Sequence, residues 1–248
     1  MLRLKEDIFS AFSFFTIIPI SGEHFSERAI NFMFLPYILV GLILTGFLFS
    51  TDGQIGHLLL AALSLLFIVI FHGGQNVDSL LDFGDGLMKR GTSEERLKAM
   101  KDLRTGAGGV IIFFFVYLIT IITLSIEIKI YLIFVLLYGQ IMSVEFMAVG
   151  LYKSKPLGEG FVYYFRKQIS GVPFLVLNVI FPAALSFVVF PEYAIQTIML
   201  ILIAFFLRRI LYRKFEGVNG DMAGATGEVG RMLSLLLVYL LPIYLTFL

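Results

Sequence analysis

The sequence predicts an all-α protein that crosses the membrane several times. Of its 248 residues, 58% are hydrophobic and only 15% are charged, whereas soluble domains carry about 25% charged residues. Several uncharged runs reach the roughly 20 residues that a helix needs to cross a bilayer. Nearly all Lys and Arg residues also lie in every second connection between these runs, that is, on one side of the membrane. Together these observations exclude a soluble globular enzyme, a disordered chain and a nucleic-acid binder with a basic surface.

About seven membrane helices are predicted from the uncharged runs. The runs cover residues 31–50, 55–73, 107–126, 130–150, 171–190, 193–211 and 232–248. A shorter apolar run, residues 8–20, is interrupted by Pro19, and we expect it to form an interfacial or re-entrant helix. Glu6 and Asp7 precede it where a secretory signal would carry basic residues, so we do not expect a cleaved signal.

The Lys and Arg residues predict the orientation of the chain. Of 19 such residues, all but Lys129 fall in four segments, 1–30, 74–106, 151–170 and 208–231. With seven spans these segments share one side, which the positive-inside rule makes cytoplasmic. The connections on the other side are too short to hold an active site. We therefore expect residues 1–248 to form a single multi-pass catalytic domain of the cell membrane, with its active site on the cytoplasmic face.

Carboxylates are the main candidates for chemistry in this chain. Cysteine is absent and only three histidines occur, which excludes a disulfide framework, a thiolate metal site and a Cys nucleophile, and leaves little room for a His-rich metal site.

The densest acidic cluster follows the second predicted span. Asp78, Asp82 and Asp85 are spaced i, i+4, i+7, which places three carboxylates on one face of a helix. Like charges at this spacing repel, and a hard divalent cation with oxygen ligands would compensate them. Mg²⁺ with bound phosphates fits this pattern. The alternative is a solvated helix end, partly neutralised by Lys89 and Arg90. We expect Asp78 to emerge at the membrane surface, in direct continuation of the span.

Asp102 and Arg104 lie in the run AMKDLRTGAGGV, where the third span begins. The glycines allow close approach of the backbone, and the planar guanidinium of Arg104 suits phosphate oxygens. Between the two motifs, five charged residues are interpreted as an ordinary amphipathic helix: Glu94, Glu95, Arg96, Lys98 and Lys101.

Glycines at 217, 220, 224, 227 and 230 fall on one helical face, which predicts close helix packing. Asp221 and Glu228, seven residues apart, lie beside that face. They are either functional acids or incidental neighbours of a packing motif. Glu145 is the one acid inside a predicted span; it is either functional or a protonated helix contact.

These motifs resemble the adenosylcobinamide-GDP ribazoletransferase (cobalamin synthase) family. The run from Gly73 to Gly86 and AMKDLRTGAGG are similar to that family's GGLHLDGLADTADG and IMRDSRIGTFG, and GVNGDMAGATGE is similar to GGVTGDVLGAxxE. The resemblance covers nearly the whole chain in order. The chain departs from the pattern where Asn76 replaces His, Ser79 Gly, Ile17 Arg, Asn219 Thr and Arg231 a later Glu.

The resemblance implies a Mg²⁺-dependent membrane transferase. Its substrates would be adenosylcobinamide-GDP and α-ribazole or the 5′-phosphate of α-ribazole, and its products GMP and adenosylcobalamin or its phosphate. Its partners would be these substrates and the lipid bilayer, without nucleic acid, and association with further copies of the chain is left open. We expect metal at Asp78, Asp82 and Asp85, catalytic roles for Asp82, Asp102, Asp221 and Glu228, and substrate contacts from Asn76, Arg104 and Asn219. The sequence does not choose between Asp102 and Glu228 as the proton acceptor.

A CDP-alcohol phosphotransferase acting on lipid is the nearest alternative. Its pattern is D-x-x-D-G-x-x-A-R followed by G-x-x-x-D-x-x-x-D. Asp82, Asp85, Gly86 and Arg90 fit the first half, but Lys89 replaces the Ala and the downstream Asp pair is absent. The substrate class therefore fits less well.

A transporter is the alternative from another class. It would carry polar residues at mid-membrane on several spans, whereas the predicted spans hold mainly Gln140, Glu145 and Asn178. Two carboxylate clusters on one surface favour catalysis at the interface.

Overall fold

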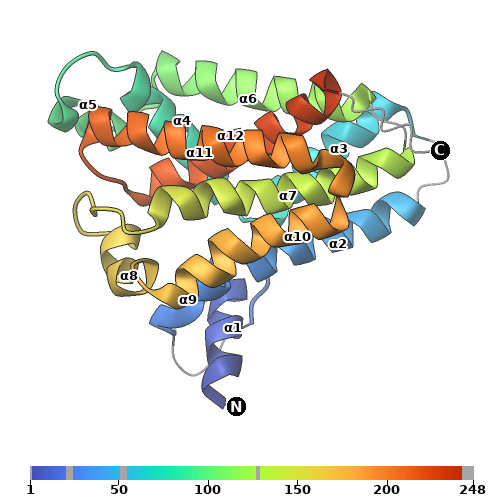
Figure 1. The fold of residues 1–248 in the computed structure, drawn as a ribbon. Coiled ribbons are helices and arrows are strands. Elements are labelled where there is room, and N and C mark those ends of the chain that lie inside the picture. The colour runs from blue at the N-terminus through green and yellow to red at the C-terminus, as the bar shows by residue number, and fades with distance from the viewer. Residues whose placement is uncertain (1, 21–24, 51–54, 127–128, 242–248) are drawn as a thin grey trace.

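The computed structural model describes residues 2–20, 25–50, 55–126 and 129–241. Over these ranges the chain is helical and contains no β-strand, which confirms the predicted all-α class. Most helices lie side by side along one direction, and α1 runs across them (Figure 1). The elements are α1 (Leu2–Phe15), η1 (Glu27–Phe32), α2 (Phe34–Ser50), α3 (His57–Phe71), α4 (Gln75–Met88), α5 (Ser93–Met100), α6 (Ala107–Ile126), α7 (Lys129–Leu151), α8 (Phe161–Ile169), α9 (Val172–Leu175), the π-helical η2 (Val176–Ile180), α10 (Phe181–Val189), η3 (Pro191–Tyr193), α11 (Ala194–Phe215) and α12 (Gly220–Leu240).

The chain is a membrane protein by the length and composition of its helices. Within the described ranges, four stretches qualify as spans: Ala107–Ile126, Phe134–Leu151, Val172–Val189 and Pro191–Phe215. They correspond to the third to sixth predicted runs. A fifth span results if α3 and α4 count as one broken span, while the described apolar part of α2 is shorter. The prediction of seven spans is thus supported for four. The turn at 51–54, residues 127–128 and the end of the last run, 242–248, lie outside the described residues.

The connection between α3 and α4 differs from the prediction. The second span was expected to run straight on to Asp78, but the axes of α3 and α4 differ by 94°. Gly73 and Gly74 make this turn with φ angles of +68° and +71°, a conformation that glycine adopts without a steric penalty. The acidic cluster therefore lies on a separate helix, and α4 packs against α5, α6 and α12.

The glycine motif from Gly220 onward and residues 232–240 of the last predicted run form one continuous helix, α12. Gly217, expected on the same helical face, lies before this helix begins, and its Cβ position faces the backbone oxygen of Lys155. The glycines of α12 face neighbouring helices as the spacing predicted. A Cβ atom on Gly224 would lie 2.6 Å from Ser79 Oγ of α4, and one on Gly230 would lie 2.5 Å from the Phe146 ring of α7. Small residues thus bring α12 close to both helices.

Of the four candidate spans, the one on helix α7 is the most enclosed. Within the span Phe134–Leu151, 89% of the residues are buried, and α7 packs against α2, α10, α11 and α12. It places the polar side chains of Gln140, Ser143 and Glu145 in the interior. Buried polar groups need partners, and the first two find them on α12.

Candidate active site between helices α4 and α12

A cavity of about 270 Å³ lies where α1, α4, α7, α8 and α12 meet. Two carboxylates line it, Asp78 from α4 and Asp221 from α12. The other lining residues are Phe14, Phe15, Gln75, Asn76, Ser79, Met147, Phe161, Gly220, Ala223 and Gly224. The structure therefore brings together two acids from motifs that are far apart in the sequence.

Both acids occupy the first turn of their helices. A carboxylate is favourable there because the free N–H groups make this end of a helix electropositive. Asn219 is the N-cap of α12: its side-chain oxygen accepts the N–H of Met222 at 3.0 Å, and its Nδ2 donates to Asp221 Oδ2 at 3.0 Å. Asn219, expected to contact substrate, thus orients Asp221.

The carboxylates of this region repel one another. Burial, followed by the charges of Asp78, Asp221 and Asp85, raises the pKa of Asp82 to about 6. Burial and the charge of Asp78 raise the pKa of Asp221. These shifts have the sign expected for desolvated carboxylates that share a site. A cation would relieve both costs.

Asp85 has partners other than the expected metal. Its two carboxylate oxygens accept hydrogen bonds from the backbone N–H groups of Gly106, at 2.7 Å, and Gly109, at 2.8 Å. These groups belong to the loop before α6 and to its first turn. Because a carboxylate satisfies the free N–H groups of a helix start, Asp85 ties α4 to α6.

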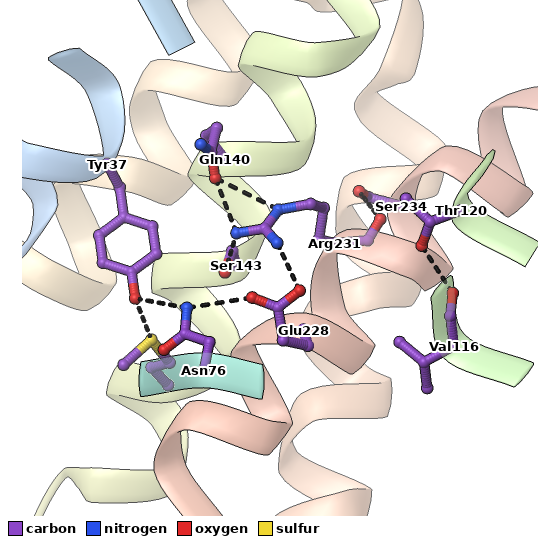
Figure 2. Close-up of polar contacts among 10 residues, drawn as sticks. Tyr37, Asn76, Val116, Thr120, Gln140, Ser143, Glu228, Arg231 and Ser234 are labelled. Carbon is purple, nitrogen blue, oxygen red and sulfur yellow. Dashed lines mark hydrogen bonds and ion pairs between the residues drawn. The ribbon is translucent and has the colours of Figure 1, made fainter. Parts of the chain in front are cut away.

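Glu228, one of the two candidate proton acceptors, does not line the cavity. Its side chain is buried and forms an ion pair with Arg231 of the same helix, and Asn76 Nδ2 donates to its other oxygen at 3.0 Å (Figure 2). Arg231 also donates to Gln140 Oε1 at 2.9 Å. This buried pair lies behind Asn76 and is enclosed by protein.

Asp102 and Arg104 are exposed and do not line the cavity. Asp102 Oδ1 accepts the backbone N–H of Arg104 at 3.0 Å. Both line a separate open depression of about 740 Å³ beside α5, together with Glu94, Leu97, Lys98, Lys101 and Leu103. Lys101 was interpreted from the sequence as an ordinary surface charge. Its positive charge partly offsets the rise in the Asp221 pKa that burial and Asp78 cause.

Sequence reasoning missed the aromatic wall of the cavity. Phe14 and Phe15 come from α1, and Phe161 comes from α8. The rings of Phe14 and Phe161 are stacked with their centroids 5.4 Å apart. The adjacent phenylalanines in the run FSFF are visible in the sequence, but nothing in their spacing indicated that α1 would reach the acids.

Glu145 is fully buried, and neither of its carboxylate oxygens has a hydrogen-bond partner among the described residues. It does not line the cavity.

In the described part of the chain, no group of three or more His, Cys, Asp or Glu side chains is arranged to hold a metal ion on its own. Any metal at the cavity would therefore need further ligands beside these carboxylates, such as an amide oxygen, water or a bound molecule.

Comparison with known proteins decides between the family that the sequence resembles and the phosphotransferase and transporter alternatives. A family model described as cobalamin-5-phosphate synthase matches residues 7–239. This chain belongs to that family. The adenosylcobinamide-GDP ribazoletransferase of Thermoplasma acidophilum is 35% identical over 233 residues, which cover 92% of this chain and 89% of the relative. The enzyme of the same name from Pyrococcus abyssi is 31% identical over 219 residues, covering 88% and 91%. No solved structure matches the chain.

Family membership confirms the resemblance seen in the sequence. Two of the motifs that carried it contribute the cavity acids, the Asp-rich run through Asp78 and the late segment through Asp221. The third motif, around Asp102 and Arg104, lies beside them in the open depression.

Proposed function

We propose that this protein transfers the adenosylcobinamide-phosphate group of adenosylcobinamide-GDP to α-ribazole, or to α-ribazole 5′-phosphate, and releases GMP. This is the reaction for which its relatives are named, and it is the last assembly step of cobalamin biosynthesis. The observation that carries the proposal is the shared cavity of Asp78 and Asp221.

The donor set fits Mg²⁺. Mg²⁺ is commonly bound by one or two carboxylates together with substrate phosphates and water. Asp78 and Asp221 supply two carboxylates, Asp82 adds a third negative charge close by, and the described residues offer no closed cage. When bound, the ion would neutralise the diphosphate and stabilise the leaving GMP.

The residues of the chain position the two substrates around these acids. Phosphoryl transfer depends mainly on positioning and charge neutralisation. The stacked rings of Phe14 and Phe161 offer an apolar face to the flat base of α-ribazole. Lys101 and Arg104, in the open depression, are available to the phosphates of the guanosine nucleotide.

The proton of the attacking ribose hydroxyl requires an acceptor within hydrogen-bond reach. Glu228 is enclosed and paired with Arg231, and Asp102 lies in the open depression. The carboxylates at the cavity are therefore better placed for this role than either candidate from the sequence. We further propose that the cavity opens on the cytoplasmic side of the cell membrane, because the basic segments flank it.

The direct test uses the full chain in detergent with Mg²⁺, adenosylcobinamide-GDP and α-ribazole. We expect release of GMP that depends on both substrates and on Mg²⁺, and loss of that release in Asp221→Asn. Absence of GMP release from folded protein, together with CMP release from a CDP-activated lipid, would refute the proposal and favour the phosphotransferase alternative.

A further inference from the structure

A buried ion pair lies directly behind the cavity. Glu228 and Arg231 have exposed fractions of 2% and 1%. Arg231 donates from Nη1 to Glu228 Oε2, from Nη2 and Nε to Gln140 Oε1 at 2.9 and 3.3 Å, and from Nη2 to Ser143 Oγ at 3.5 Å. Burying two charges is costly, and such a pair is weak evidence for stability. Its position therefore calls for another explanation.

The pair fixes the amide orientation of Asn76. Asn76 Nδ2 donates to Glu228 Oε1 at 3.0 Å and to Tyr37 Oη at 3.3 Å, and Tyr37 donates in turn to Met147 Sδ at 3.2 Å (Figure 2). An ionised carboxylate only accepts hydrogen bonds. The NH₂ group must therefore face Glu228, and the flipped amide would set two acceptors against each other.

This orientation turns the carbonyl oxygen of Asn76 toward α12. Asn76 Oδ1 lies 3.4 Å from the position of a Cβ atom on Gly224, and both residues line the cavity that holds Asp78 and Asp221. Ser79 Oγ lies closer still to that position, at 2.6 Å, so glycine at 224 lets α4 pack directly on α12 beside the amide. The amide thus has a donor side toward the buried pair and an acceptor side toward Gly224, one helical turn from Asp221.

We propose that the Glu228–Arg231 pair is a positioning device that holds Asn76 Oδ1 toward the cavity as a third oxygen ligand for a divalent cation. Asn76 would contact the ion, Glu228 would select the orientation of the amide, and Arg231 would hold Glu228 charged and in place. The inference rests on the metal site of the proposed function. Partners that orient a ligand from behind typically change metal affinity or activity by about 10- to 100-fold.

The experiment titrates Mn²⁺ into the purified full chain in detergent, without substrate, and follows free Mn²⁺ by electron paramagnetic resonance. In Glu228→Gln the side chain can donate as well as accept, so the preference for one Asn76 orientation is lost. We expect the Kd for Mn²⁺ to rise about 10- to 100-fold. In this variant Arg231 keeps its positive charge but loses its carboxylate partner. The double variant Glu228→Gln with Arg231→Met, called the neutral pair, removes both charges. It is measured beside the single variant and should show the same loss in a folded protein.

A polarity swap provides the rescue. In Asn76→Asp combined with Glu228→Gln, the Gln amide donates to one Asp oxygen and the other oxygen is left for the cavity. We expect this double variant to bind Mn²⁺ more tightly than Glu228→Gln alone. The matched control is Asn178→Ser, at a fully buried asparagine that binds backbone groups of η1 and α2. It should lower the melting temperature without changing the Kd for Mn²⁺.

Unchanged Mn²⁺ affinity in the folded neutral pair, or a polarity swap no better than Glu228→Gln, would overturn the inference. Either result would leave the proposed function intact, provided that the parent chain binds Mn²⁺ and releases GMP. A parent chain that binds no Mn²⁺ would instead refute the metal site itself.

Discussion

Two carboxylates of the same helix, Asp78 and Asp85, meet different surroundings. Asp78 is exposed and faces the cavity shared with Asp221. Asp85, two helical turns further on, has both oxygens engaged by backbone N–H groups at the start of α6. Helical spacing thus places both on one face, but the neighbouring element decides what each can bind. One end of the motif is available to a ligand, and the other holds two helices together.

Glycine residues allow the contact between Asp85 and the start of α6. A Cβ atom on Gly109 would lie 2.4 Å from the backbone oxygen of Leu81, so α6 approaches α4 more closely than any other residue would permit. The N–H groups of Gly106 and Gly109 thereby come within reach of Asp85.

The largest expected effect is the loss of activity in Asp78→Asn, with little change in stability. If this carboxylate contacts the metal, kcat/KM for GMP release should fall at least about 100-fold, at or beyond the upper range for residues that only orient a ligand. The melting temperature should change little, because exposed substitutions usually alter stability by about 0.5 kcal/mol or less. Full activity in this variant would remove Asp78 from the site.

Asp85→Ala is expected to lower the stability of the protein rather than its Mn²⁺ binding. It leaves two backbone N–H groups at the α4–α6 contact without an acceptor, which costs about 1–3 kcal/mol of unfolding free energy. Thermal unfolding in detergent, measured beside Asp78→Ala, checks this. An unchanged melting temperature combined with lost Mn²⁺ binding would make Asp85 a ligand after all.

Gly109→Ala tests the close approach from the other side of the contact. Overpacking typically costs about 1–3 kcal/mol, and here the clash is with backbone. Gly46→Ala on α2 is the matched control, because nothing lies within 4 Å of its added Cβ. The control should be neutral or slightly stabilising in the same unfolding measurement; equal effects of both substitutions would argue against a specific contact.

The smallest effect is expected from Arg104→Ala. Exposed charge pairs contribute about 1 kcal/mol or less, so the KM for adenosylcobinamide-GDP should rise by less than about fivefold with kcat unchanged. A decrease in kcat/KM as large as that expected for Asp78→Asn would contradict a minor role for Arg104 and would favour closure of the loop at Asp102 and Arg104 over the cavity during the reaction.

The sequence predicted much of this architecture because hydropathy and glycine spacing are local signals. Helices occur at all the predicted runs in the described residues, and the face of Gly224 and Gly230 packs against neighbours as expected. It did not predict the 94° turn after α3, because a Gly-Gly pair permits many directions. Nor did it predict that α1 would supply Phe14 to the cavity, which depends on tertiary packing alone.

Only part of the candidate site could be predicted from the sequence. Asp78 and Asp221 line one cavity, whereas Glu228, seven residues after Asp221, turns to Arg231 in the interior. The metal-binding and catalytic roles of these residues stay predictions. The spacing of two acids along a helix cannot show which of them will pair with a buried arginine. Asn76 and Arg231, two departures from the family pattern, both contact Glu228, a coupling visible only once α4 packs on α12.

The central claim is that Asp78 and Asp221 hold one divalent cation together. A double-mutant cycle on Mn²⁺ binding, with Asp78→Asn, Asp221→Asn and the double variant, tests it most directly. We expect a single binding site in the parent chain, strongly weakened by either substitution, with the double variant scarcely weaker than each single one. Independent, additive losses, or two separate sites that each variant removes in turn, would contradict the account.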